Sequence, residues 1–118
     1  MIRIEINELP RLQTNTYSNW RIRHGYTKLW HRRVGEALIH FQAKIESPLK
    51  RSKILCIRRS LKEPDYDNLV ISFKPIIDGL KVYGVIEDDK TSNVMITYIW
   101  QKVKKRIDQK VIIEIGPL

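Results

Sequence analysis

The chain has 118 residues, a mass of 14.0 kDa, 42% apolar residues and a net charge of +9. This size predicts a single domain over 1–118, and one cysteine excludes an internal disulfide. No apolar run approaches the ~18 residues that a membrane helix needs, and the N-terminus alternates charged and apolar residues, unlike a signal peptide. The expected location is therefore the cytoplasm, and the basic charge favours a polyanionic partner.

The first elements follow from periodicity. Residues 2–8 alternate apolar and polar side chains, which predicts a strand with one buried face. Residues 11–26 are polar, aromatic and basic without a clear period, which predicts a long loop. This loop is either an arm that grips phosphates through residues such as Arg21 and Arg23, or a solvated loop whose rings fold onto the core.

A helix is predicted over 28–46, with Thr27 as its N-cap. Its apolar face recurs at helical spacing and consists of Trp30, Val34, Leu38, Phe41 and Ile45. Ser47-Pro48 is expected to end the helix. A second strand opens at Ile54–Ile57 and runs toward Arg58 and Arg59.

The second half of the chain predicts one more helix and two more strands. The helix follows Asp67 and is bent or restarted at Pro75. Strands are expected at 94–102 and 109–115, joined by a charged hairpin turn. The fold class is therefore α+β, in the order β-α-β-α-β-β, with a mixed sheet packed against two helices. The helix between the second and third strands predicts a crossover connection.

The acidic residues are concentrated in one segment. Residues 63–89 contain seven acidic residues and two lysines, a net charge of −5, while the rest of the chain carries +14. A basic body attracts phosphates, whereas the acidic segment repels them unless divalent cations neutralise it. This contrast is what a metal-dependent enzyme acting on nucleic acids needs.

Asp65 and Asp67 are two residues apart and follow Pro64. In an extended chain both side chains would point to one side, about 6.6 Å apart, and could share a cation. Asp67 is also a good N-cap for the next helix. Asp88 and Asp89 can return to the same place if the intervening helix folds back. The alternative is that the first pair only caps a helix and the second only forms a turn.

Carboxylates of this kind suit Mg²⁺ or Mn²⁺, which prefer hard oxygen ligands and keep several waters. Such an ion would activate a water for in-line attack on a phosphodiester. Lys74 would be the nearby cation for the scissile phosphate.

Three motifs resemble the RusA-type Holliday junction resolvases. They are Asp65-x-Asp67-Asn68-Leu69, Lys74-x3-Asp78-x-Leu80 and Gly84-x3-Asp88-Asp89. The N-terminal strand, Leu9-Pro10 and the loop containing Asn15 are also similar to the family's opening, so the resemblance covers nearly the whole chain. One departure is that the stretch between Leu69 and Lys74 is about three residues longer than in the best-known form; this is nearly one helical turn, so the lysine keeps its face.

The resemblance implies a homodimeric endonuclease that needs Mg²⁺ or Mn²⁺ and nicks two opposed strands of a four-way DNA junction, in a bacterial or phage-encoded setting. The family's catalytic aspartates fall on Asp65, Asp67 and Asp89, with Asp88 as the close alternative to Asp89 as a metal ligand, and its lysine falls on Lys74. Nucleic-acid contacts are expected from Lys74 and from Asn15, Arg21, Arg23, Arg58 and Arg59. Neither a membrane nor a small-molecule substrate is expected.

Two other functions stay open. One is a non-catalytic nucleic-acid-binding protein that keeps the fold, and the other is a broader nuclease of branched DNA. A pure binding protein has no physical reason to keep three carboxylates on a surface that faces phosphate.

Overall fold

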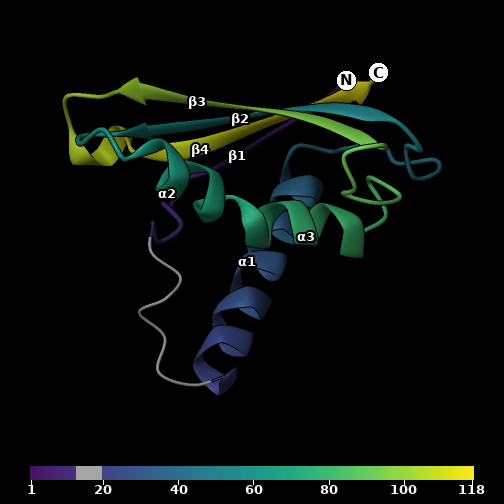
Figure 1. Ribbon diagram of the computed structural model, residues 1–118, viewed down its shortest axis with the longest axis horizontal. Helices are drawn as coiled ribbons and strands as arrows, with labels where there is room; N and C mark the ends of the chain where they lie inside the picture. Colours follow the sequence, from purple (N-terminus) through teal and green to yellow (C-terminus); the bar gives the residue numbers. More distant parts are fainter. Residues whose placement is uncertain (13–19) are drawn as a thin grey trace.

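The computed structural model describes residues 1–12 and 20–118. The elements are β1 (Ile2–Ile6), α1 (Trp20–His40), β2 (Ser52–Ser60), α2 (Tyr66–Ser72), α3 (Lys74–Val82), β3 (Val94–Lys102), the short 3-10 helix η1 (Arg106–Asp108) and β4 (Lys110–Pro117). The strands form one mixed sheet, and the helices lie on one of its faces (Figure 1). The predicted α+β class and the order β-α-β-α-β-β are confirmed, with the second helix divided into α2 and α3.

The strands are arranged in the order β1-β4-β2-β3. β2 and β3 are parallel, as the predicted crossover requires, and β4 is antiparallel to both β1 and β2. The predicted hairpin of the last two strands is wrong, because β2 separates β3 from β4. β4 takes a central position because it is the most apolar strand, buried from Val111 to Ile113 and again at Ile115. β3 is left at an edge of the sheet.

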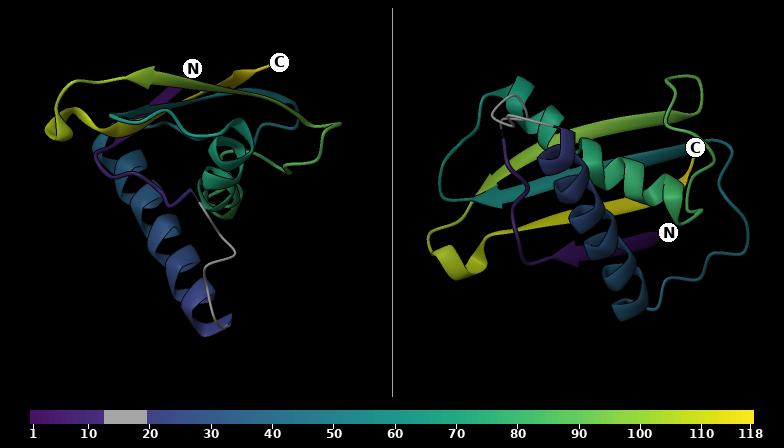
Figure 2. Two further views of the ribbon diagram at one scale, coloured as in Figure 1. Left: turned by 60° about the vertical axis from the view of Figure 1, so that its left-hand side comes forward. Right: turned by 90° about the horizontal axis from the view of Figure 1, so that it is seen from below.

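The core lies between the sheet and the helices. The strands contribute fully buried side chains such as Ile4 and Ile113, while α1 contributes Val34 and α3 contributes Leu80. The right-hand view of Figure 2 shows α1 and α3 lying across the same face of the sheet. The two helices approach closely because Gly79 of α3 lies against Val34.

α1 begins and ends earlier than predicted. It starts at Trp20, so the end of the predicted loop is helical and Thr27 lies inside the helix rather than at its N-cap. It ends at His40 because Gln42 adopts a left-handed conformation with φ of 52°. The amides of Gln42 and Ala43 then donate to the carbonyls of Ile39 and Leu38, a Schellman ending. No helix within the described residues is both long enough and apolar enough to cross a membrane.

The break between α2 and α3 affects the backbone conformation of the acidic segment. Phe73 is fully buried at the junction, and Pro75 occupies the first turn of α3, where a missing N–H costs nothing. α2 begins at Tyr66, so its N-cap is Asp65 and not Asp67, which lies in the first helical turn. The predicted extended spacing of the two aspartates is therefore wrong.

We expect Gly79→Val to lower the free energy of unfolding by about 1–3 kcal/mol, because extra methyl groups overpack a close helix contact. A Cβ at Gly79 would already lie 3.1 Å from Cγ2 of Val34, a stiff branched side chain. Gly25→Ala is the matched control: no atom of residues 1–12 or 20–118 lies within 4 Å of a Cβ there, so the helix should gain about 0.5–1 kcal/mol. Urea denaturation of the three proteins gives both values, and equal stability of Gly79→Val and the parent chain would contradict the contact.

Candidate metal and nucleic-acid site

Lys74, at the start of α3, joins two acidic residues that are distant in sequence from each other. Its Nζ donates to Oδ1 of Asp78 at 3.0 Å and to Oδ2 of Asp89 at 3.1 Å. Asp78 lies one helical turn away, where an i,i+4 ion pair is expected. Asp89 lies in the segment that connects α3 to β3. The lysine therefore fastens this segment to the helix, and it brings together two of the predicted site residues, Lys74 and Asp89.

Two further lysines surround the pair Asp88 and Asp89. Nζ of Lys81 lies 3.4 Å from Oδ1 of Asp88 and 3.9 Å from Oδ1 of Asp89. Nζ of Lys90 lies 3.7 Å from Oδ2 of Asp88. With Lys74 on Oδ2 of Asp89, every carboxylate oxygen of the pair has an ammonium group within 4 Å. The two charges of this acidic pair are thus neutralised within the chain.

The pKa shifts of Lys74 and Asp88 keep these two groups charged at neutral pH. Hydrogen bonds to Asp78 first, and then to Asp89, raise the pKa of Lys74 above its ordinary value. The pKa of Asp88 lies below its ordinary value, mainly because its carboxylate accepts the amide N–H of Asp89 at 2.8 Å. Lys74 is therefore a fixed cation rather than a proton acceptor, and Asp88 is an anion rather than a proton donor.

Asp65 and Asp67 differ from the second acidic pair because both are exposed and form no ion pair with the described residues. Asp65 has extended backbone angles, φ −62° and ψ 145°, and its side chain makes no capping hydrogen bond. No ion pair reaches either carboxylate from the residues that the structure describes. Both charges lie at the start of α2, where the partial positive charge of the helix N-terminus stabilises anions.

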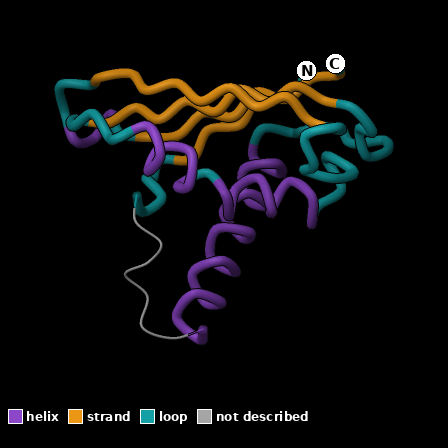
Figure 3. Tube along the Cα trace, viewed as in Figure 1, coloured by secondary structure: helices purple, strands orange, loops and turns teal. Residues whose placement is uncertain are grey.

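The two acidic pairs lie at opposite ends of the crossover between β2 and β3. Since these strands are parallel, the chain leaves one end of the sheet after β2 and re-enters β3 at the other. Figure 3 shows the loop before α2 and the loop after α3 at opposite sides of the molecule. Within residues 1–12 and 20–118, no three His, Cys, Asp or Glu side chains lie close enough to hold one metal ion. The predicted return of Asp88 and Asp89 to the first pair does not occur inside one chain.

Tyr98 of β3 lies between the two halves of the segment. Its ring centroid is 5.9 Å from that of Phe73 at the α2–α3 junction. Burial, and after it the neighbouring Cys56 and Tyr66, raises the pKa of Tyr98 to about 12, while Lys74 acts in the opposite direction. The middle of β3 is thus the part of the sheet that faces both the start of α2 and the start of α3.

Two of the predicted arginine contacts are exposed. Arg21 and Arg23 lie in the first turns of α1, which project away from the sheet (Figure 1). The guanidinium of Arg21 lies 5.9 Å from the ring centroid of Trp20, which is itself 64% exposed. This end of α1 therefore presents cationic and aromatic groups together. Asn15, also predicted to contact nucleic acid, lies outside the described residues.

The other two predicted arginine contacts, Arg58 and Arg59, are not on that surface. Arg58 is buried, with 6% exposure, and its Nη1 donates to the carbonyl oxygen of Pro10 at 2.7 Å. It holds the segment after β1 against the sheet, so we leave it out of the proposed nucleic-acid contacts. Arg59 is the next residue of β2, so its side chain points to the opposite face of the sheet, which carries no helices. There its Nε donates to Oε1 of Gln101 at 2.8 Å.

Lys81 was missed by sequence reasoning. It follows Lys74 by seven residues, which is two helical turns, so spacing alone places both lysines on one face of α3. The spacing of the two lysines can be seen in the sequence, but the groups that this face of α3 contacts cannot.

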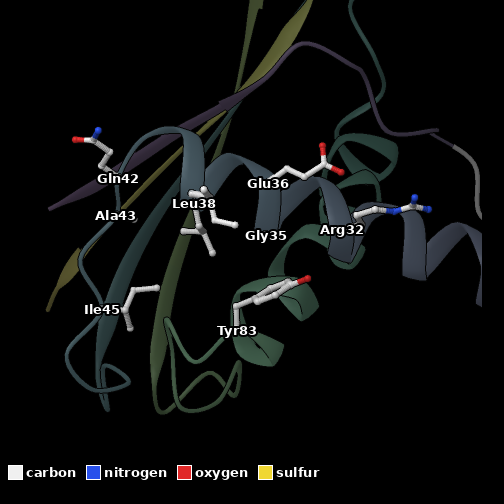
Figure 4. Close-up of a pocket in the computed structure, with 9 residues that line it drawn as sticks. Arg32, Gly35, Glu36, Leu38, Gln42, Ala43, Ile45 and Tyr83 are labelled. Carbon is white, nitrogen blue, oxygen red and sulfur yellow. The ribbon is translucent and has the colours of Figure 1, made fainter.

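A separate hollow of about 560 Å³ lies beside the end of α1 and Tyr83 (Figure 4). Its lining includes Leu38 and Ile45 and none of the predicted site residues. It is an apolar surface feature and not part of the acidic segment.

A comparison of the chain with models of protein families finds no match, and a comparison with curated proteins finds none either.

Proposed function

We propose that the chain is a Mg²⁺-dependent, structure-selective DNA endonuclease that resolves four-way junctions by paired symmetric nicks. It would act as a homodimer in a bacterial or phage-infected cytoplasm, and its resemblance to the RusA-type resolvases is the starting point. The observation that carries the proposal is the 3.1 Å contact between Lys74 and Asp89, because it joins two of the motifs behind the resemblance, 15 residues apart, in one ionic cluster.

The carboxylates fit a hard divalent cation on chemical grounds. Asp88 and Asp89 already hold ammonium groups against ionised oxygens, while Asp65 and Asp67 expose two uncompensated anions. Mg²⁺ is commonly bound by one or two carboxylates together with waters and substrate phosphates, so each pair is a sufficient donor set. We propose Asp65, Asp67 and Asp89 as metal ligands, with Asp88 as the alternative to Asp89; within the described residues of one chain the first two lie apart from the third, so each pair would bind its ion separately there. Mn²⁺ would serve in the same role.

The bound ion would supply an activated water and charge neutralisation at the phosphodiester. Side chains of the chain itself would bind and position the DNA. Lys74 stays protonated because its pKa is raised, so it binds a phosphate oxygen and does not take the proton of the attacking water. Asp65 and Asp67, exposed at the start of α2, are accessible to a strand on the surface. The exposed arginines Arg21 and Arg23 would hold DNA through its phosphates.

A second candidate is a non-catalytic nucleic-acid-binding protein with the same fold. It is favoured by one observation, namely that the described residues of a single chain do not bring three carboxylates to one point. In that case the lysines around Asp88 and Asp89 would be structural ion pairs, and divalent cations would not affect the protein.

The test is cleavage of a synthetic mobile four-way junction with and without Mg²⁺, read at nucleotide resolution. We expect nicks at symmetric positions on two opposed strands, only when Mg²⁺ or Mn²⁺ is present. Forked and linear duplexes of the same sequence are the substrate controls, and equal cleavage of them would indicate a broader nuclease of branched DNA. Tight junction binding with no cleavage at any Mg²⁺ concentration would support the binding protein instead.

A further inference from the structure

The chain between β3 and β4 carries a concentration of positive charge that the candidate site does not use. Residues 102–108, which we call the η1 turn, contain four basic residues and one acidic residue, a net charge of +3. All four bases are exposed, and none of them forms an ion pair with any residue that the structure describes. They are Lys102, Lys104, Lys105 and Arg106. Lys110, just after the turn, is instead paired with Glu5 at 2.8 Å. The charges of the η1 turn are therefore available to an anionic partner.

The same turn displays the most exposed large apolar side chain of the described residues. Ile107 is 87% exposed, more than Met1 at the start of the chain, at 83%. A single exposed isoleucine is common on protein surfaces and needs no explanation by itself. Here, however, it directly follows three of the four unpaired bases. An apolar group and several cations are thus presented together.

Hydrogen bonds hold the η1 turn in one conformation. The amide of Asp108 donates to the carbonyl of Lys105 at 3.1 Å. The amide of Gln109 donates to the carbonyl of Arg106, also at 3.1 Å. Oε1 of Gln109 accepts the amide N–H of Leu61 at 3.1 Å, which ties the turn to the segment between β2 and α2. A side chain presented on a fixed turn loses less conformational entropy on binding than one on a mobile loop.

The η1 turn lies at the same end of the sheet as the exposed aspartates. The amide of Val103 donates to the carbonyl of Ser60 at 3.1 Å, and from Ser60 the chain leads to Asp65 at the N-cap of α2. Figures 1 and 2 show the short helix before β4 and the loop that enters α2 at this end. A DNA strand bound at Asp65 and Asp67 would therefore have the η1 turn at the same end of the protein.

We propose that Ile107 is a wedge that selects branched DNA: it inserts among the base pairs at the branch point and displaces a base, while the bases of the η1 turn bind the flanking phosphates. Isoleucine is one of the apolar side chains that proteins insert between base steps, with lysine and arginine nearby. In a continuous duplex each base pair is stacked on both sides, so insertion is costly. A base pair at a branch point lacks one stacking neighbour, and displacing it costs less. This inference rests on the proposed function, because it assigns the junction selectivity of that nuclease to Ile107.

The insertion is tested in EDTA, so that no strand is cut. A four-way junction carries 2-aminopurine beside its branch point, where fluorescence rises when the base leaves its stack. We expect the parent protein to raise this fluorescence and Ile107→Ala to bind with little rise. Ile39→Ala is the matched control, because Ile39 is 80% exposed on α1, outside the η1 turn, and it should behave like the parent. Both variants should fold, since exposed substitutions change stability little.

Affinities separate the apolar contact from the cationic ones. Ile107→Ala should lower the ratio of junction affinity to linear-duplex affinity by about tenfold, because it removes aliphatic carbons that leave water only at the branch point. It should not change the salt dependence. Lys104→Gln should instead weaken junction and duplex binding alike, and reduce the magnitude of the salt slope by about 0.9, since a phosphate contact does not distinguish the two.

An Ile107→Ala protein that keeps the fluorescence rise and the affinity ratio of the parent would overturn the wedge, and cleavage of junctions by the parent in Mg²⁺ would leave the nuclease function standing. A fluorescence rise that Ile107→Ala abolishes, in a parent that cuts nothing at any Mg²⁺ concentration, would support the wedge and overturn the nuclease function. If the parent binds phosphatidylserine vesicles through Ile107 and Ile107→Ala leaves junction binding unchanged, the turn is a membrane contact and the wedge is wrong.

Discussion

We expect Asp67→Asn to lower the rate of junction cleavage by at least about 100-fold, because loss of a ligand removes several kcal/mol of transition-state stabilisation. Junction binding should be kept or become tighter. Asp67 is exposed and has no ion pair within the described residues, so its charge only repels phosphate when no cation is present. Single-turnover cleavage and gel-shift assays on the same junction measure the two effects independently.

Asp108→Asn is the control for this substitution. Asp108 is an exposed acidic residue of η1, outside the acidic segment, and the change removes the same charge. Its cleavage rate should stay close to that of the parent protein. If Asp67→Asn cuts at the parent rate, Asp67 is not a ligand and the assignment of the acidic segment fails.

We expect the affinity for a four-way junction to fall steeply with salt, by about 1,000-fold or more between 50 and 200 mM if six or more phosphates are neutralised. The reason is that the residues outside the acidic segment carry a charge of +14, and phosphate binding by lysine and arginine releases condensed counterions. Titrations at several salt concentrations give the slope of log K against log salt.

Arg21→Gln should reduce the magnitude of this slope by about 0.9, the contribution of one phosphate contact. Arg3→Gln is the matched control, because Arg3 lies on β1 and its charge is already paired with Glu114 at 2.7 Å. A slope near zero for the parent protein would mean that the basic surface does not bind DNA at all. An equal loss for both variants would mean that Arg21 is not a specific contact.

Several features of the fold could be predicted because they depend on neighbouring residues. The alternation in residues 2–8 predicts β1, with Ile4 and Ile6 buried, and the helical spacing of Trp30, Val34 and Leu38 predicts the buried face of α1. The proline rule also anticipates a break near Pro75. In each case the pattern repeats within one or two turns or a few strand residues, so the local chain contains the information.

Other features required the tertiary structure. The charge pattern around 28–46 does not reveal that Gln42 takes a left-handed conformation and ends α1 early. Arg58 and Arg59 look alike in sequence, but strand alternation and the carbonyl of Pro10 bury one while the other lies on the opposite face. The backbone conformations of Asp65 and Asp67 depend on where α2 begins, and burial of Leu69 and Phe73 favours a start at Tyr66.

The sequence by itself determined the α+β class, the parallel crossover and the acidic segment in a basic chain, because composition and short-range periodicity carry them. Only the tertiary structure decided that β4 lies between β1 and β2, which leaves β3 at the edge and the acidic pairs at opposite ends of it. Strand order depends on contacts between residues as far apart as Ile2 and Ile115, and the burial that selects among such pairings belongs to the whole sheet rather than to any segment.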